Sequence, residues 1–345
     1  MTLTEVTQKL KRYWHFLVLF LAAFLLLGFI FRSQPGKPPA KLPPPSIATY
    51  SASTQPQVFD FSKLPEQKFP KTASVYRTTV SKFSKEQAVN MAAKLNFGPN
   101  PTQILEQTKT GALYAWIEGG RSLTVSEQTV HFDVSLPETG NPNIKLDIKA
   151  AEPVAIGFLQ RMGVDIQNLK INPELTRYFK IEKAAIFAAT KDAADVVEFN
   201  FQAQIEGYPL FGRSSDSGQA TVRVDKRNEV VFFAQNQLAN FVKADSYRLL
   251  DFDTAKSLAE QGRGTIVKAV AKTPEGLLDV RVQPGFNIAK AIISKVFLAY
   301  YYPVPIPETT QPIFVFEGDF VDKKRQEGQL TIYLPAIEGQ VVSQQ

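Results

Sequence analysis

The sequence of 345 residues has no cysteine and only two histidines. Without cysteine the chain cannot form disulfide bonds, use a thiol nucleophile or hold a metal through thiolates. His15 lies in an apolar run near the N-terminus, so any serine–histidine–aspartate triad would depend on His131. The alternating residues Thr129–Asp133 around His131 are typical of a strand, which favours a surface or partly packed histidine over a catalytic base.

Sequence motifs of nucleotide-binding and hydrolytic enzymes are also missing. The chain has no P-loop and no G-x-S-x-G, and Gly212–Gly218 only resembles the latter. Gly262–Gly264 holds part of a dinucleotide fingerprint, but it follows a predicted helix instead of a strand. Asp251 and Asp253 stand at a predicted helix start, where capping explains them. We therefore predict no catalytic residue, no cofactor and no metal, and hence no enzyme.

The charged residues are of both signs and form no basic stripe. The formal net charge is +6, from 39 lysines and arginines and 33 acidic residues. Residues 1–32 hold four basic residues and one acidic residue, so half of the excess falls there. A small excess spread over so many charges is typical of a solvated surface, and we predict that nucleic acid is not a partner.

One long uncharged segment stands out. Trp14–Phe31 gives eighteen consecutive residues without a charge, and an α-helix of that length spans about 27 Å, close to the roughly 30 Å hydrocarbon core of a bilayer. The alternative, a cleaved signal peptide, needs a shorter run followed by a small-x-small site. Phe29–Arg32 is bulky and then charged. We predict a transmembrane helix at 13–32 that contacts the lipid bilayer through Trp14–Phe31.

The flanking charges set the expected topology. Three basic residues lie on each side of the segment, so their number alone is a tie. As a group, those on the N-terminal side, Lys9, Lys11 and Arg12, lie nearer to the segment, and such clusters favour the cytoplasmic face. We predict a cytoplasmic tail at 1–12 and a single-pass, signal-anchored protein of the cytoplasmic membrane whose C-terminal region is extracytoplasmic.

A proline-rich linker is predicted at 33–70, where nine of the 23 prolines fall. Such a stretch cannot bury a core and prefers extended polyproline II conformation. We expect it to act as a passive stalk. The aromatic residues Phe59, Phe61 and Phe69 near its end are expected to dock onto the folded part.

Three short amphipathic helices are predicted beyond the linker, each with a start signal and a glycine at its end. The start signals are the capping box Ser84–Gln87, Pro153 in the first turn of the second helix, and Asp251 or Asp253; the glycines are Gly98, Gly163 and Gly262. The apolar stripes are narrow and rich in alanine, which suits helices that lie close to one face of a sheet.

The strand signals are stronger. Val197–Ile205 alternates apolar and polar residues, which predicts a strand with one buried face and one wet face. Glu118–Arg121 is a hairpin turn between two such strands, and hairpins predominate. We predict an α+β fold of antiparallel sheets with short helices on one face. A break at Asn168–Pro173 suggests domains at 71–170 and 171–345, although a single larger domain stays open.

A resemblance becomes visible over residues 190–340. The order is a strand, Gly207–Phe211, a loop, and Gln219–Arg227 with its V-x-V-D end; later come Ile288–Tyr300 and Pro312–Val315. This order resembles extracytoplasmic regulators of two-component systems of the YycH/YycI type and, more loosely, PepSY-type modules of a β-hairpin and a helix. The resemblance implies a single N-terminal anchor and a role in tuning a membrane sensor histidine kinase. It supplies no catalytic residue.

These observations lead to one main functional hypothesis and two alternatives. The main hypothesis is a non-enzymatic, membrane-anchored regulator or scaffold that acts by protein–protein contact, with Tyr208, Pro209, Tyr300 and Tyr302 as candidate partner-binding residues. The tyrosines have a second interpretation, which is inward packing. The first alternative is an envelope ligand-binding module or protease inhibitor. The second, a carboxylate-dependent cell-wall hydrolase, needs an aromatic-lined cleft, and Trp116 is the only tryptophan outside the apolar run.

Overall fold

The structure, a computed structural model, describes residues 42–47, 55–80, 82–107, 111–140, 144–213, 218–236, 239–273, 276–280, 287–303 and 306–340. Within these ranges no helix combines the length and the apolar character needed to cross a membrane. The transmembrane helix predicted at 13–32 lies outside the described residues. The chain from Pro43 to Gln345 forms one compact unit.

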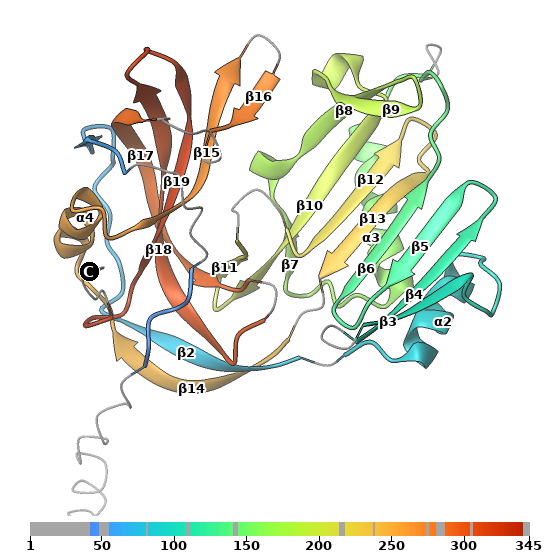
Figure 1. Cartoon of the computed structure of the whole chain (residues 1–345), viewed down its shortest axis with the longest axis horizontal. Coiled ribbons are helices and arrows are strands. Elements are labelled where there is room, and N and C mark those ends of the chain that lie inside the picture. Colours follow the sequence, from blue (N-terminus) through green and yellow to red (C-terminus); the bar gives the residue numbers. More distant parts are fainter. Residues whose placement is uncertain are drawn as a thin grey trace, which may run out of the picture. The chain divides into compact units, whose positions relative to one another are not determined.

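The first sheet is antiparallel throughout and has two helices against one face (Figure 1). Its strands follow the order β3–β4–β5–β6–β13–β12–β10, and the other edge of β10 pairs with β7 and β8, with β9 next to β8. The bounds are β3(Gln103–Gln107), β4(Gly111–Glu118), β5(Arg121–Val125), β6(Thr129–Val134), β7(Leu169–Ile171), β8(Arg177–Glu182), β9(Ala185–Ala188), β10(Val196–Ile205), β12(Ala220–Asp225), β13(Val230–Asn236), α2(Lys85–Lys94) and α3(Ile148–Met162), with the 3₁₀ turns η1(Pro173–Leu175) and η2(Lys191–Ala193).

The second sheet is built mainly from long C-terminal hairpins. Strands β1 and β11 pair in parallel with one edge of β17, and β18, β19, β15 and β16 follow in antiparallel order. Strands β2 and β14 pair with each other, and β2 continues onto the start of β18. The bounds are β1(Val58–Asp60), β2(Thr72–Thr79), β11(Tyr208–Phe211), β14(Asn240–Arg248), β15(Thr265–Thr273), β16(Gly276–Asp279), β17(Ile288–Tyr301), β18(Thr309–Asp322), β19(Glu327–Pro335) and α4(Phe252–Glu260).

The described residues therefore have an α+β fold of mostly antiparallel sheets with three short α-helices, as predicted. The boundary predicted near residue 170 falls inside the first sheet. Strand β6 precedes that position and pairs with β13, which follows it, with Phe132 opposite Phe233. The sheet hydrogen bonds thus join the two predicted domains, in agreement with the single compact unit.

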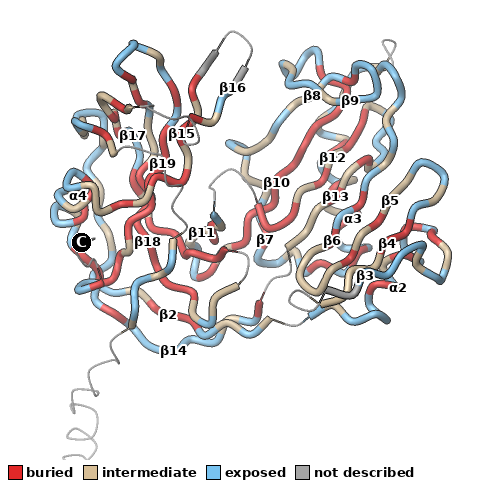
Figure 2. Tube along the Cα trace, viewed as in Figure 1, coloured by how far each residue is buried: buried red, intermediate tan, exposed pale blue. Residues whose placement is uncertain are grey.

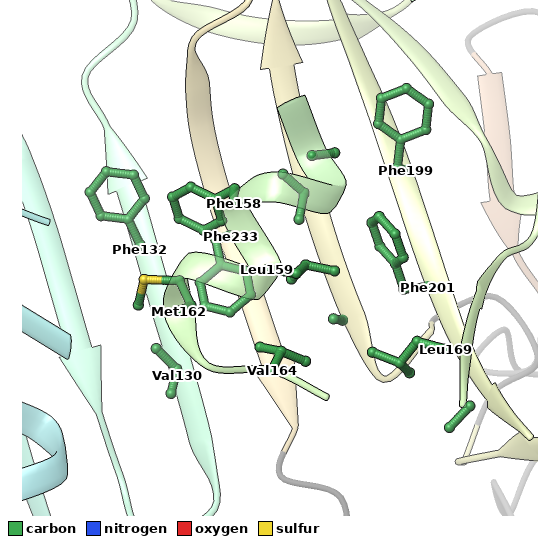
Figure 3. Packing of buried hydrophobic residues seen from close by; sticks show 14 of the residues in the cluster. Val130, Phe132, Phe158, Leu159, Met162, Val164, Leu169, Phe199, Phe201 and Phe233 are labelled. Carbon is green, nitrogen blue, oxygen red and sulfur yellow. The ribbon is translucent and has the colours of Figure 1, made fainter. Parts of the chain in front are cut away.

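The main core lies between α3 and the first sheet. Phe158 of α3 packs edge-on against Phe233, with ring centroids 5.2 Å apart, and also contacts Phe132 at 6.3 Å. Figure 3 shows these rings beside Leu159 and Met162, which project from the same helix toward the sheet. The burial pattern in Figure 2 follows the strands that underlie the helix. Packing of this stripe, more than helix propensity, holds α3 in place.

The helix starts agree with the predicted caps at two helices and correct the third, while among the predicted C-terminal glycines Gly163 caps α3 and Gly98 lies beyond the end of α2, whose C-cap is Leu95. Ser84 and Gln87 form the capping box of α2 in full, and Asp251 caps α4 through the backbone of Thr254. Helix α3 begins earlier than predicted, because the Asp147 carboxylate accepts hydrogen bonds from two backbone N–H groups of the first turn. Pro153 consequently lies inside the helix and not in its first turn.

The C-terminal part of the predicted linker belongs to the fold. Phe69 packs against Phe252 and Phe314 with ring centroids 5.3 and 5.2 Å apart, and β1 adds a strand to the second sheet. The carbonyl of Pro43 accepts hydrogen bonds from the side chains of Gln311 and Gln340, at 3.2 and 3.1 Å. The docking predicted for Phe59, Phe61 and Phe69 is confirmed, while the extended stalk predicted up to residue 70 is too long.

Candidate binding cleft between the two sheets

The polar face of β10 is buried, which corrects the wet face predicted for this strand. Glu198, Asn200 and Gln202 are only 3, 2 and 5 % exposed. The segment 172–177 lies over this face and bonds to it: Asn200 donates to the carbonyl of Leu175 at 2.8 Å. Asn172 donates to the Gln202 side chain at 2.9 Å. Buried polar groups need such partners, and here the segment 172–177 supplies them.

The charge at one end of this face is paired. Glu198 accepts a charge-assisted hydrogen bond of 2.7 Å from Nε of Arg223, and Asn200 donates to its other oxygen at 3.1 Å. The guanidinium of Arg223 also lies 4.2 Å from the ring centroid of Phe232 and 5.2 Å from that of Phe179. Arginine is the cation suited to such a stacked, bonded position.

The other end of the polar face opens into a cleft between the two sheets. This central cleft has a volume of about 500 Å³. Its walls come from β7 and η1 on one side, β11, β17 and β18 on the other, and the end of β10 between them. The lining residues are Lys170, Ile171, Asn172, Pro173, Glu174, Leu175, Gln202, Gln204, Pro209, Phe211, Lys295, Phe297 and Glu317.

Lys295 joins the two walls electrostatically. Its Nζ lies 3.0 Å from Oε2 of Glu174 on η1 and 3.5 Å from Oε2 of Glu317 on β18. Burial lowers the pKa of Lys295, but the two carboxylates outweigh it and hold that pKa above its usual range. Burial raises the pKa of Glu317, and Lys295 offsets only part of this effect. Shifted groups that gather in a cleft are a sign of a functional site.

The four predicted partner-binding residues lie at two depths. Pro209 lines the central cleft, and half-buried Tyr208 packs against Tyr300 with ring centroids 6.3 Å apart. Tyr300 and Tyr302 are buried, 1 and 3 % exposed. The Tyr300 hydroxyl donates to the carbonyl of Ser74 at 3.0 Å.

The Tyr302 oxygen accepts a hydrogen bond of 2.8 Å from the backbone N–H of Ala239, and burial raises the pKa of Tyr302 to about 12. Tyr300 and Tyr302 therefore lie in the core, as the inward-packing interpretation expects. Contact of any of the four residues with a partner stays a prediction.

Sequence reasoning missed the group of Glu174, Lys295 and Glu317. Lys295 and Glu317 do carry a signal, since each interrupts a run of apolar and β-branched residues in a predicted strand. Glu174 lies 121 positions from Lys295 and has no local pattern that marks it. His131 is exposed and its ring meets Phe232 edge-on at 4.9 Å, which places it at the surface as expected. In the part of the chain that the structure describes, no cluster of acidic residues and histidines could hold a metal ion.

Comparison with known proteins adds a likeness of fold alone. No family model matches the sequence, and no curated protein matches it. Among solved structures, an uncharacterized protein from Eubacterium rectale ATCC 33656 is similar, with a TM-score of 0.50 and 10% sequence identity. The match covers 83% of this chain and 89% of that chain. It indicates that the arrangement of strands and helices occurs elsewhere.

Proposed function

We propose that the protein is a membrane-anchored, non-enzymatic regulator or scaffold outside the cytoplasmic membrane, and that the central cleft holds an extended segment of a partner protein. The composition of the cleft carries this proposal. The side-chain amide of Gln204 bonds to no other described residue, and Phe211 and Phe297 line the same cleft. Extended peptides need amide partners for the backbone and apolar pockets for alternate side chains.

The partner class follows from the predicted anchor. Ten residues, 33–42, separate the predicted transmembrane helix from Pro43, the first residue of the compact unit. A segment of that length reaches at most about 35 Å when fully extended. With the predicted helix in the bilayer, Pro43 therefore lies within that distance of it, and the folded unit is in reach of the extracytoplasmic part of a membrane protein. A sensor histidine kinase, which the resemblance to YycH/YycI-type regulators implies, fits this position.

A small envelope ligand is the second candidate occupant. The cleft volume of about 500 Å³ falls within the range of small-molecule sites. The ionic group of Glu174, Lys295 and Glu317 would orient a polar ligand, and the two phenylalanine rings would cover its apolar part. This candidate differs from the first in requiring no membrane partner.

A carboxylate-dependent hydrolase fits the geometry less well. Glu174 and Glu317 do face one another from opposite walls, in outline the arrangement such an enzyme needs. The ammonium group of Lys295, however, contacts both carboxylates and occupies the space where a glycosidic bond would have to lie.

A site-specific photo-crosslinking experiment in intact cells tests the proposal. The crosslinker replaces Gln204 in the full-length chain, and a matched control places it at Lys85, an exposed position on α2. We expect an adduct with one membrane protein from position 204 and none from position 85. A third chain, in which an unrelated anchor replaces Trp14–Phe31, asks whether the anchor contributes to recognition.

The outcomes separate the candidates. An adduct at 204 that persists in the anchor-swapped chain places recognition in the cleft, and one that is lost shows that the anchor takes part. Equal adducts at 204 and 85, or no protein adduct at 204, contradict the proposal and favour the small-ligand alternative. That alternative is then checked by mass spectrometry of small molecules that copurify with the chain.

A further inference from the structure

A second concave surface lies beside α3, on the face of the first sheet that this helix covers. This α3 trough has a volume of about 650 Å³. Its walls come from the exposed side of α3, the C-terminal end of α2, the end of β6 with the residues after it, and the β12–β13 turn. It shares no lining residue with the central cleft.

Part of the α3 wall of the trough, at Pro153 and Gly157, has small or no side chains. Pro153, Gly157 and Arg161 follow one another at four-residue intervals, so they form one stripe, and all three line the trough. Proline and glycine are the two costliest residues inside a helix, at about 3 and 1 kcal/mol relative to alanine. A Cβ atom added at Gly157 would meet no other atom within 4 Å, so packing does not require glycine there. The stripe leaves helix backbone open to an occupant.

One end of the trough is positively charged. Lys94, Arg121 and Arg161 line it, and none of them pairs with an acidic side chain among the described residues. Arg121 is held rigidly, because its guanidinium donates to the carbonyls of Leu95 and Asn96, at 2.8 and 3.1 Å, and stacks 4.8 Å from the Phe97 ring centroid. Its remaining N–H donors are therefore preorganised for a carboxylate.

The rest of the trough is neutral and partly apolar. At the far end, Arg227 is neutralised by Asp225 and Glu229, at 3.1 and 3.4 Å. Half-buried apolar side chains lie between the two ends, and they are Val134, Leu136, Val154 and Val230. An occupant that matches this surface has acidic groups at one end and apolar groups along its length.

We propose that the α3 trough binds an extended acidic segment of a partner protein, whose backbone lies along Gly157 and whose carboxylates pair with Arg161, Arg121 and Lys94. Charge complementarity favours this occupant, and the backbone left open by the Pro153–Gly157 stripe suits an extended chain. The site goes beyond the function proposed for the central cleft, since it is a separate surface on another face.

Fluorescence anisotropy with a labelled peptide, Glu-Leu-Glu-Val-Glu, tests the proposal on the full-length chain in detergent. A peptide with glutamine in place of glutamate is the matched probe. We expect the glutamate peptide to bind at least about tenfold more tightly than the glutamine peptide, and the difference to shrink at high salt. Equal affinity for both peptides, or no binding of the glutamate peptide, overturns the proposal.

Three variants locate the binding. Gly157→Leu fills the trough and removes a helix-interior glycine, so the chain should fold at least as stably and yet bind about tenfold more weakly. Arg161→Glu should weaken binding similarly, and Lys191→Glu, an exposed charge reversal outside the trough, should not. Unchanged binding by Gly157→Leu overturns the site. Displacement of the peptide by oleate, an anionic lipid, at lower concentration than by unlabelled peptide overturns the proposed peptide occupant. None of these results bears on the Gln204 crosslink, so the two proposals fail independently.

Discussion

The two faces of strand β10 are both removed from water, but different interactions hold them. Toward α3 the strand presents Phe199 and Phe201, each 2 % exposed, which pack in the main core. Toward the segment 172–177 it presents Glu198, Asn200 and Gln202, which are joined by hydrogen bonds and ion pairs. An apolar face is stabilised by the area it buries, whereas a polar face must satisfy each group it desolvates.

This difference has a structural consequence for the cleft. Apolar packing tolerates small shifts, but a network of hydrogen bonds fixes the position of each participant. The polar face of β10 therefore holds η1 at a defined place, and η1 carries Glu174 to its position beside Lys295. The apolar face supplies most of the stability, and the polar face places the binding groups.

The largest expected effect is at the apolar face. Phe199→Ala should lower the free energy of unfolding by about 3–5 kcal/mol, since it removes a large buried ring and leaves a cavity. Urea unfolding of the full-length chain, followed by tryptophan fluorescence, measures it. Phe187→Ala is the control, because that ring is 51 % exposed on β9 and should cost less than about 0.5 kcal/mol. Similar losses from both variants would show that Phe199 is not a core residue.

The next effect is at the polar face. Asn200→Ala removes the donor to Leu175 and to Glu198 and the acceptor for Thr221. We expect a loss of about 1–3 kcal/mol, because those groups stay buried without a partner. The same unfolding experiment measures it. A loss under about 0.5 kcal/mol would mean that water replaces the side chain and that the network does not hold η1.

Much of the local structure is predictable, and the buried polar face is not. Caps and tight turns depend on neighbouring residues, so Ser84, Asp251 and the Gly119–Gly120 turn could be recognised directly; both glycines have positive φ, as that hairpin turn requires. The alternation in β10 states only that two faces differ. Whether the polar one meets water depends on 172–177, which folds over it from a distant part of the chain.

The group of Glu174, Lys295 and Glu317 could not be predicted from the sequence for a related reason. The register of β17 against β18 shifts between Ile293 and Lys295, and a shift of one residue changes the face on which the following side chains lie. Alternation along β17 therefore could not place Lys295 toward the cleft. Glu174 and Glu317 come from two other elements, and only the tertiary fold brings them to the same ammonium group.

The pH dependence of stability tests whether Glu317 is buried in the cleft wall. Its pKa is raised by burial above the ordinary value of 4.5, so the folded state binds the proton more tightly than the unfolded state. The stabilisation from protonated Glu317 is complete below pH 4.5 and is lost as the pH rises through the folded pKa. Relative to Glu317→Gln, the natural chain should therefore lose stability between pH 4 and pH 7.

Urea unfolding of both chains at several pH values checks this prediction. Lys295→Met removes the cation that opposes the effect of burial, so in its background the loss between the two pH values should be larger. A difference between the natural chain and Glu317→Gln that stays constant with pH would show that Glu317 is solvated, and would remove it from the cleft wall.

The smallest expected effect on stability is at Gln204, where the polar face of β10 leaves the buried hydrogen-bond network and lines the cleft. Gln204 follows Gln202 on the same face but is only half-buried, and its side-chain amide bonds to no other described residue. Gln204→Ala should therefore change the free energy of unfolding by less than about 0.5 kcal/mol, although the equivalent change at Asn200 costs several times more. If Gln204→Ala destabilised the chain as much as Asn200→Ala, its amide would belong to the structural network. A small loss instead leaves Gln204 as a polar group that the fold positions and does not use, which is the property required of a side chain that binds a partner.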